Sequence, residues 1–134
     1  MDDVIRRVLA MRTWAVVGAS PAPSRDSHRI AAMLESRGYR VFRVNPNWED
    51  AYAAVADVPE QVEVVDIFRR ADEAGVHVEE AIEIGARAVW MQLGVVDLAA
   101  ADRARAAGLE VVMDRCPAIE MPRLGIERWS GEAA

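Results

Sequence analysis

The stretch Trp14-Ala-Val-Val-Gly18-Ala-Ser-Pro-Ala-Pro-Ser-Arg-Asp-Ser-His28 decides the fold, because it passes from one kind of secondary structure to another within a few residues. Its apolar beginning, Trp14 to Gly18, predicts a buried strand that ends in a turn. A helix is expected to begin between Ser24 and Ser27, where serine and aspartate favour a helix N-terminus. A buried strand followed by a helix is the unit from which parallel sheets are built.

The same alternation continues along the rest of the chain. Further strands are predicted at 39–44, 62–68, 88–93 and 109–113. The helix that begins between Ser24 and Ser27 is expected to end at Arg37, and further helices are predicted at 4–9, 72–85 and 97–108, with a short helical turn after Pro117. Residues 48–59 fit either a helical turn or an irregular crossover. Five strands separated by helices imply right-handed crossovers. The expected fold is α/β: a Rossmann-like, doubly wound, five-stranded parallel sheet in three layers, forming one domain over residues 1–134.

Composition excludes several classes of function. The chain has 134 residues and a net charge of -6, which argues against nucleic acid as a partner because nucleic-acid binding relies on a basic surface. The single cysteine excludes a disulfide framework, and all 16 basic residues are arginine, which excludes Schiff-base and P-loop lysine chemistry. No apolar run approaches the roughly 20 residues of a membrane span, and the N-terminus lacks a signal-peptide pattern. We therefore expect a cytoplasmic protein that does not bind membranes.

A ligand site is expected at one end of the sheet, because such sheets bind ligands beyond the carboxyl ends of their strands. At the first end, Gly18 and the helix that follows would direct unpaired backbone N–H groups toward an anion. Arg25 and His28 lie at the same helix start, where a cation is unfavourable unless an anion is nearby. The predicted contact residues of this loop are Gly18, Ala19, Ser20, Pro21, Ser24, Arg25 and His28.

The loop differs from a dinucleotide-binding fingerprint. It has only the first glycine of the pattern G-x-G-x-x-G, and Pro21 and Pro23 stiffen a segment that glycines usually make flexible. A dinucleotide pyrophosphate therefore fits less well. Ser20, Ser24 and Ser27 fit turn and N-cap roles as well as ligand contacts.

The second and third strand ends carry candidates for a nucleoside. NAD-binding folds have an acidic residue after the second strand, whereas this chain has Arg43-Val-Asn45-Pro46. Arg43 suits a phosphorylated ribose, and the Asn45-Pro46 turn suits the floor of an adenosine pocket; a surface arginine and an ordinary turn are the alternative. Phe68 is a candidate to stack on adenine and Arg69 to stack or reach phosphate, although core packing also explains Phe68.

The fourth and fifth strand ends place an amide and a thiol at the same edge. Gln92 needs hydrogen-bond partners in an apolar strand, so it satisfies the backbone or binds an amide-bearing ligand, with Gly94 beside it. Cys116 is either a buried inert thiol or a thiolate favoured by the adjacent Arg115. These residues complete the predicted ligand rim.

No catalytic or metal-binding residues are predicted. His28 and His77 belong to different elements and have no metal-ligand spacing, and no G-x-S-x-G motif is present. A triad from Ser20, Asp26 and His28 would require side chains of one turn to converge. We therefore favour a binding protein over an enzyme.

Five ordered motifs together resemble a known family. They are Val17-Gly-Ala-Ser-Pro-x-Pro-x-Arg-x-Ser-His28, Gly38-Tyr39 with Val44-Asn-Pro46, Val65-Asp-Ile-Phe-Arg69, Val89-Trp-Met-Gln-Leu-Gly94, and Asp114-Arg-Cys116 with Ile119-Glu120. The chain resembles the small single-domain CoA-binding proteins and is similar to the N-terminal domain of the succinyl-CoA synthetase α subunit. The resemblance extends from the first helix to about Glu120.

The resemblance implies that coenzyme A binds at the strand ends. The loop from Ser20 to Ser24 and the helix start would hold the pyrophosphate, Asn45-Pro46 with Phe68-Arg69 would frame the adenosine, and Gln92 and Gly94 would lie along the pantetheine. Arg43 is our candidate for the 3′-phosphate because of its charge. The chain lacks the synthetase's second domain with its phosphorylated histidine, and it has no lysine near Asn45-Pro46, so thioester synthesis is not implied.

Three functions follow from these residues. The leading expectation is a non-catalytic module that binds the small molecule CoA or acyl-CoA, with oligomeric state and protein partners left open. The first alternative is redox-linked exchange between Cys116 and the CoA thiol. The second is a sensor that binds a dinucleotide of the FAD or NADP type.

Overall fold

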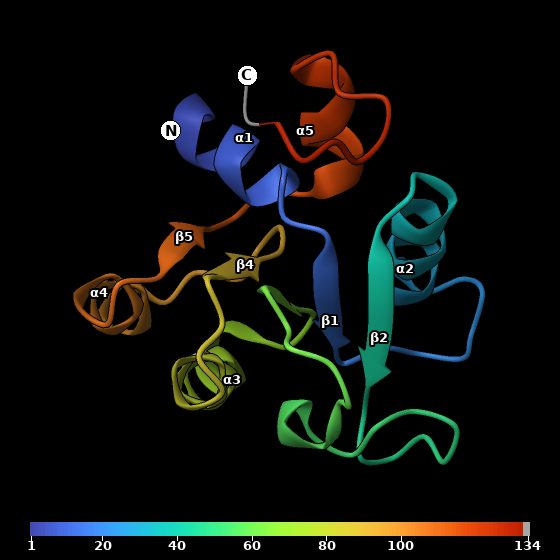
Figure 1. The fold of residues 1–134 in the computed structure, drawn as a ribbon. Coiled ribbons are helices and arrows are strands. Elements are labelled where there is room, and N and C mark those ends of the chain that lie inside the picture. Colours follow the sequence, from blue (N-terminus) through green and yellow to red (C-terminus); the bar gives the residue numbers. More distant parts are fainter. Residues whose placement is uncertain (133–134) are drawn as a thin grey trace.

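The computed structural model describes residues 1–132 and confirms the predicted α/β class, with five parallel strands in the order β2-β1-β3-β4-β5 (Figure 1). The strands are β1 (Thr13–Val17), β2 (Arg40–Val44), β3 (Val64–Ile67), β4 (Ala88–Met91) and β5 (Glu110–Val112). The helices are α1 (Asp2–Leu9), α2 (Asp26–Ser36), the 3-10 helix η1 (Val55–Asp57), α3 (Ala71–Glu83), α4 (Leu98–Ala106) and α5 (Pro117–Arg123).

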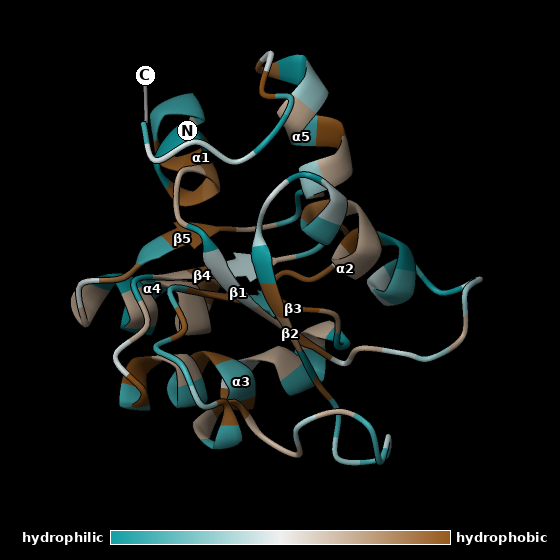
Figure 2. Ribbon diagram, turned by 45° about the vertical axis from the view of Figure 1, so that its right-hand side comes forward, coloured by the Kyte–Doolittle hydropathy of each residue, from teal (hydrophilic) through white to brown (hydrophobic). Residues whose placement is uncertain are grey.

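The sheet lies between two helical layers. Helices α1, α2 and α5 cover one face, and α3 and α4 cover the other (Figure 1). Successive residues of a strand point to opposite faces, so Trp14 packs with the first layer and Ala15 with the second. Both faces are buried, which explains why β1 and β4 are almost entirely apolar, whereas the edge strand β2 carries the polar residues Arg40 and Arg43. Figure 2 shows the hydrophobic colour concentrated on the sheet and on the helix surfaces that face it.

The strand order places a crevice between β1 and β3. The chain passes from β1 to β2 on one side and then returns to β3 on the other side of β1, so the sheet has its topological switch point there. Gly18 follows β1 with φ of +83°, and a Cβ at this position would lie 2.5 Å from the carbonyl oxygen of Phe68. Only glycine therefore allows the ends of β1 and β3 to lie this close.

Two regions differ in detail from the sequence prediction. Within residues 48–59 the chain forms the short helical turn η1 and a single bridge between Val44 and Tyr52, so both alternatives are present: a helical turn within an irregular crossover. Strand β4 ends at Met91 rather than at residue 93, because the backbone turns away through Gly94, which has φ of +80°. Gln92 consequently lies just beyond the strand. None of the helices within residues 1–132 is long and apolar enough to cross a membrane.

Candidate functional site

A cavity of about 750 Å³ opens at the switch point. This volume lies in the range of about 300–1,000 Å³ that is typical of small-molecule sites. The cavity is bounded by the end of β1, the start of α2, the segments after β3 and β4, and the start of α5. Its lining residues are Gly18, Ser24, Arg25, Asp26, Ser27, Arg29, Ile30, Phe68, Arg69, Arg70, Gln92, Leu93, Gly94, Val95, Cys116, Ala118 and Ile119.

The structure therefore places part of the predicted set together. Gly18, Ser24, Arg25, Phe68, Arg69, Gln92, Gly94 and Cys116 line the cavity. Ala19, Ser20, Pro21, His28, Arg43, Asn45 and Pro46 lie outside its lining. The apolar lining residues Leu93, Val95 and Ile119 were not predicted, since nothing in their local sequence distinguishes them from core residues.

Side chains of the loop before α2 and of the first turn of α2 hold this loop in place. Ser27 Oγ accepts a hydrogen bond from the backbone N–H of Ser20 at 3.0 Å, and Ser20 Oγ accepts one from Ala22 N–H at 3.1 Å. His28 Nδ1 lies 3.2 Å from the carbonyl oxygen of Ser20. No side chain caps α2. The N–H group of His28 donates to the carbonyl oxygen of Arg25 at 3.1 Å, so the N–H groups of Asp26 and Ser27 are the ones left for an anion in the cavity.

The arginines of the cavity differ in their partners. Arg69 pairs with Glu73 at 2.5 Å and Arg70 pairs with the same carboxylate at 3.1 Å. Arg29 pairs with Asp26. Arg25, the N-cap residue of α2, has no ion pair within residues 1–132. Its guanidinium can therefore contact an anion without breaking an existing ion pair.

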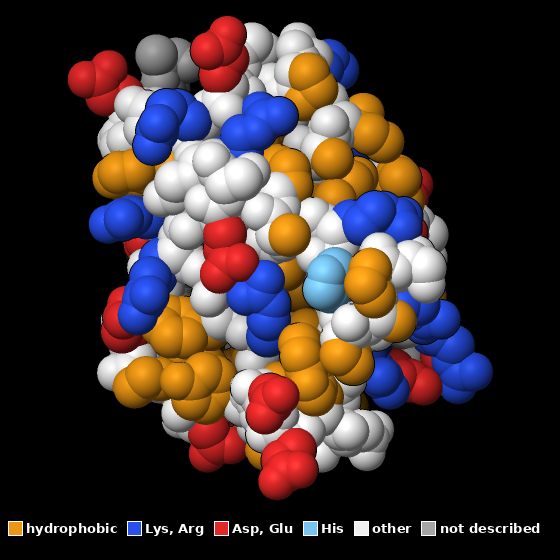
Figure 3. All heavy atoms as spheres, turned by 90° about the vertical axis from the view of Figure 1, so that its right-hand side faces the viewer, with side chains coloured by type: hydrophobic (Ala, Val, Ile, Leu, Met, Phe, Trp, Pro, Cys, Tyr) orange, Lys and Arg blue, Asp and Glu red, His pale blue; other side chains and the backbone are white. Residues whose placement is uncertain are grey.

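Most other arginines also form ion pairs with acidic side chains, so their charges do not add up to a continuous basic surface. On the face of the molecule that carries β2 and α2, basic and acidic side chains are interspersed (Figure 3). Arg43, in β2, donates to both carboxylate oxygens of Glu35 at 3.1 and 2.7 Å. Contact between Arg43 and a ligand phosphate would require this bidentate pair to open, and such contact stays a prediction.

Asn45 joins the end of β2 to the loop after β1. Its Nδ2 donates to the carbonyl oxygen of Ala19 at 2.8 Å, and its Oδ1 accepts from Asn47 N–H at 2.9 Å. Pro46 is exposed beside it. The turn therefore fixes the position of the loop between β1 and α2.

Gln92 has a partner that neither sequence interpretation foresaw. Its Nε2 donates at 2.7 Å to Oδ1 of Asp66, which is fully buried in β3. The other carboxyl oxygen of Asp66, Oδ2, has no hydrogen-bond partner within the described residues. Burial raises the pKa of Asp66 to about 8, although the Gln92 hydrogen bond lowers it. The signal for this site was available: an aspartate stands among Val64, Val65 and Ile67.

A second aspartate shapes the segment after β4. Asp114 Oδ1 accepts from Gly94 N–H at 2.7 Å, and Asp114 itself has φ of +60°. Aspartate tolerates this left-handed conformation better than most residues. The contact holds the cavity wall formed by residues 92–95 against the end of β5.

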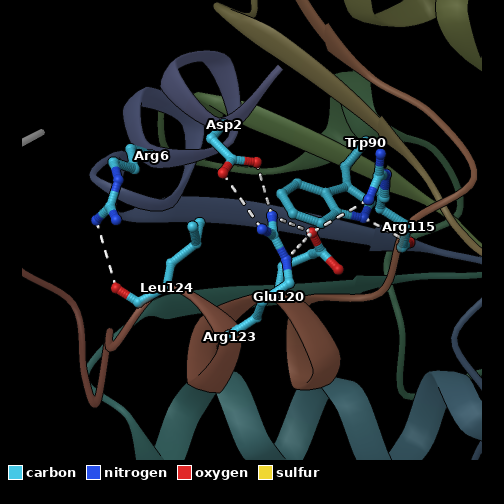
Figure 4. A network of polar contacts seen from close by, with 7 residues as sticks. All are labelled: Asp2, Arg6, Trp90, Arg115, Glu120, Arg123 and Leu124. Carbon is cyan, nitrogen blue, oxygen red and sulfur yellow. Dashed lines mark hydrogen bonds and ion pairs between the residues drawn. The ribbon is translucent and has the colours of Figure 1, made fainter.

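Helix α5 is anchored to the sheet and to α1 by a polar network (Figure 4). Buried Glu120 accepts from Arg123 at 2.8 Å and lies 3.5 Å from Arg115, while Arg123 also pairs with Asp2 of α1. Trp90 of β4 donates through Nε1 to the carbonyl oxygen of Arg115 at 2.9 Å. The start of α5 is thereby fixed at the cavity.

Cys116 is the N-cap residue of α5 and is only partly exposed. Burial raises the pKa of its thiol, although hydrogen bonds from the backbone N–H groups of Ala118 and Ile119 lower it. Arg115 is directed to Glu120 instead. The burial of the thiol therefore outweighs its place at a helix N-terminus, and a thiolate of Cys116 is disfavoured. Within residues 1–132, no three His, Cys, Asp or Glu side chains are grouped so that they could hold a metal ion.

The sequence and fold match known proteins. The family model described as "CoA binding domain" matches residues 12–122. The uncharacterized protein YneT of Bacillus subtilis is 32% identical over 107 residues, which cover 76% of this chain and 79% of the relative. A hypothetical protein from Pyrococcus horikoshii OT3 is 37% identical with a TM-score of 0.87, over 92% of each chain.

A larger protein shares the fold. The dinucleotide-forming acetyl-coenzyme A synthetase 1 of Ca. Korarchaeum cryptofilum superposes with a TM-score of 0.71 at 24% identity, over 85% of this chain and 28% of the synthetase. The likeness at this identity is one of fold. Because the family model extends over most of the chain and over all five strands, the chain belongs to the CoA binding domain family.

Proposed function

We propose that this protein binds coenzyme A or acyl-CoA in the cavity at the carboxyl ends of β1, β3 and β4, without catalysis of its own. The observation that carries the proposal is the uncapped N-terminus of α2, which opens with Arg25 into a cavity large enough for a small-molecule cofactor. Membership of the CoA binding domain family supports the choice of ligand.

The pyrophosphate would lie at the start of α2. The N–H groups of the first turn and the positive end of the helix dipole favour an anion there. Arg25 would add a charge-assisted hydrogen bond, and Arg69 is near enough to the loop that its Cδ lies 3.0 Å from a Cβ built on Gly18.

The two ends of the ligand would follow the two walls of the cavity. Phe68, which is partly buried beside Gly18, supports a place for the adenine ring. The pantetheine arm would pass Gln92 and Gly94 toward Cys116 and the apolar side chains of Leu93, Val95 and Ile119. Arg43 is the proposed contact of the 3′-phosphate once Glu35 releases it.

Calorimetric titration with CoA, dephospho-CoA and NAD tests the proposal. We expect CoA to bind more tightly than NAD, because the cavity offers an apolar wall to the arm rather than a second nucleoside site. If Arg43 contacts the 3′-phosphate, dephospho-CoA should bind about 1–2 kcal/mol more weakly than CoA. No binding of CoA, or no advantage of CoA over NAD, would contradict the proposal.

Thiol exchange is a second candidate because Cys116 lines the same cavity as Gln92. A thiolate of Cys116 would attack CoA disulfide, forming a protein–CoA disulfide and releasing one CoA thiol. Its raised pKa predicts slow exchange at neutral pH. The intact mass of the protein after incubation with CoA disulfide tests this candidate, since an unmodified wild-type protein would contradict it.

The other alternative, a sensor that binds a dinucleotide of the FAD or NADP type, is tested by including FAD and NADP in the same calorimetric series.

A further inference from the structure

The pair of Asp66 and Gln92 links the interior of the sheet to the cavity. Asp66 is fully buried, whereas Gln92 is 6% exposed and lines the cavity. The Nε2 end of Gln92 is bound to Asp66 Oδ1 at 2.7 Å. The carbonyl end, Oε1, has no hydrogen-bond partner within residues 1–132 and is not enclosed as Asp66 Oδ2 is. Gln92 thus connects a buried acid to the space proposed for the ligand.

The hydrogen bond to Asp66 determines whether the side-chain amide of Gln92 presents a donor or an acceptor to a ligand. A glutamine carries a donor at Nε2 and an acceptor at Oε1. When Asp66 holds the donor end, the acceptor end is the one left to contact a ligand in the cavity. An amide without such a partner would turn freely and present either group.

Packing does not account for an aspartate at this position. Its neighbours in the strand are Val64, Val65 and Ile67, all fully buried, and a further aliphatic residue would fit the pattern. A buried carboxyl group with one unpartnered oxygen destabilises a fold. A role in the cavity would explain why a polar residue stands there.

We propose that Asp66 is a positioning residue for the ligand: by holding Nε2 of Gln92, it presents the Gln92 carbonyl oxygen to the cavity as the acceptor for an amide N–H of the ligand. The inference rests on the proposed function, because the pantetheine arm of CoA is the part that carries amide N–H groups. The nucleotide part of CoA contains no amide N–H group that could donate to Gln92 Oε1.

The test compares two ligands that differ by the arm. CoA and 3′-phosphoadenosine 5′-diphosphate, which has no pantetheine, are titrated calorimetrically against the wild type and the variants D66V, D66N and Q92A. D66V should weaken CoA binding about 5- to 10-fold and leave the armless nucleotide unchanged, as expected for the loss of one hydrogen bond. D66N retains an acceptor for Gln92 Nε2, so its CoA affinity should stay within about twofold of wild type. The double variant D66V/Q92A should bind CoA no more weakly than Q92A, because the two residues act as one unit.

Other outcomes overturn the inference. D66V with unchanged CoA affinity, an equal loss for both ligands, or losses that add fully in the double variant would each show that Asp66 does not act through Gln92 on the arm. Failure of wild type to bind CoA would overturn the proposed function and the inference together. If D66V does not fold, the side-chain amide signals of Gln92 in the wild type decide: protection of its Nε2 protons before and after CoA addition supports the proposal, and loss of protection upon CoA addition contradicts it.

Discussion

Single residues at the switch point set the shape of the site. Gly18 permits the ends of β1 and β3 to approach, Asn45 fixes the loop between β1 and α2, and Asp114 holds the segment after β4. Each acts on the backbone rather than on a ligand. Together they position the backbone segments that line the cavity.

Replacement of Gly18 by alanine tests the close approach of these strands. G18A should lower the free energy of unfolding by more than about 2 kcal/mol, because the new Cβ adds steric overlap to an unfavourable φ. G108A is the matched control: Gly108 has φ of +90° with no atom within 4 Å of a built Cβ. The control should cost about 1 kcal/mol from backbone strain alone. Equal costs in urea unfolding would contradict the steric explanation.

The raised pKa of Asp66 predicts a pH-dependent stability. Between the ordinary value of 3.8 and about 8, the unfolded chain carries an ionised Asp66 while the folded chain keeps the proton. The unfolded state therefore binds fewer protons, and Asp66 lowers the stability as the pH rises through this range.

The variant D66N removes this titration. Its stability relative to wild type should increase with pH by up to about 1.4 kcal/mol per unit between pH 5 and pH 8. Urea unfolding of both proteins across that interval measures the slope. A difference that stays constant with pH would contradict the buried, protonated state of Asp66.

At the scale of elements, α2 and α5 begin at the cavity and differ in what holds them. The start of α2 is left uncapped, and its loop is braced through Ser20 and Ser27. The start of α5 is fixed by the hydrogen bond of Trp90 to the Arg115 carbonyl oxygen and by the ion pairs of Glu120 with Arg115 and Arg123. One helix start is thus free to bind an anion, and the other forms a wall.

Substitution of Glu120 tests the anchoring of α5. E120Q keeps the shape of the side chain but removes the charge that Arg115 and Arg123 contact, so it should lower stability by about 1–2 kcal/mol. E60Q, which removes the charge of an exposed ion pair with Arg40, is the control and should leave stability unchanged. An effect of E60Q as large as that of E120Q would show that burial is not the cause.

At the scale of the whole molecule, both apolar clusters share one sheet. The cluster around Trp14 and Trp90 and the cluster around Val65 and Val89 lie on opposite faces of the same strands. Loss of the sheet would expose both. We therefore propose that the chain is one domain that unfolds in a single transition, in which tryptophan fluorescence and far-UV circular dichroism report the same midpoint. Separate midpoints would contradict this.

The sequence predicted the fold better than the partners of individual side chains. Apolar runs such as 88–91 and the loop from Gly18 to His28 carry local signals for strands and turns, so class, strand positions and the end of the sheet that bears the cavity could be predicted. The pairs Arg43–Glu35 and Gln92–Asp66 depend on how separate elements pack. No local pattern encodes such pairs, which is why Arg43 was predicted without its partner Glu35 and Gln92 without its partner Asp66, although an aspartate in an apolar strand is itself a visible signal.

The central claim is that the start of α2 holds the phosphates of coenzyme A, and the dissociation constant of CoA for wild type, R25A and R87A tests it most directly. Arg25 lines the cavity, whereas Arg87 precedes β4 at the opposite end of the sheet and pairs with Glu63. We predict that wild type and R87A bind CoA equally and that R25A binds about 10-fold more weakly, as expected for one charge-assisted hydrogen bond. No binding by wild type, or equal affinities of R25A and R87A, would contradict the claim.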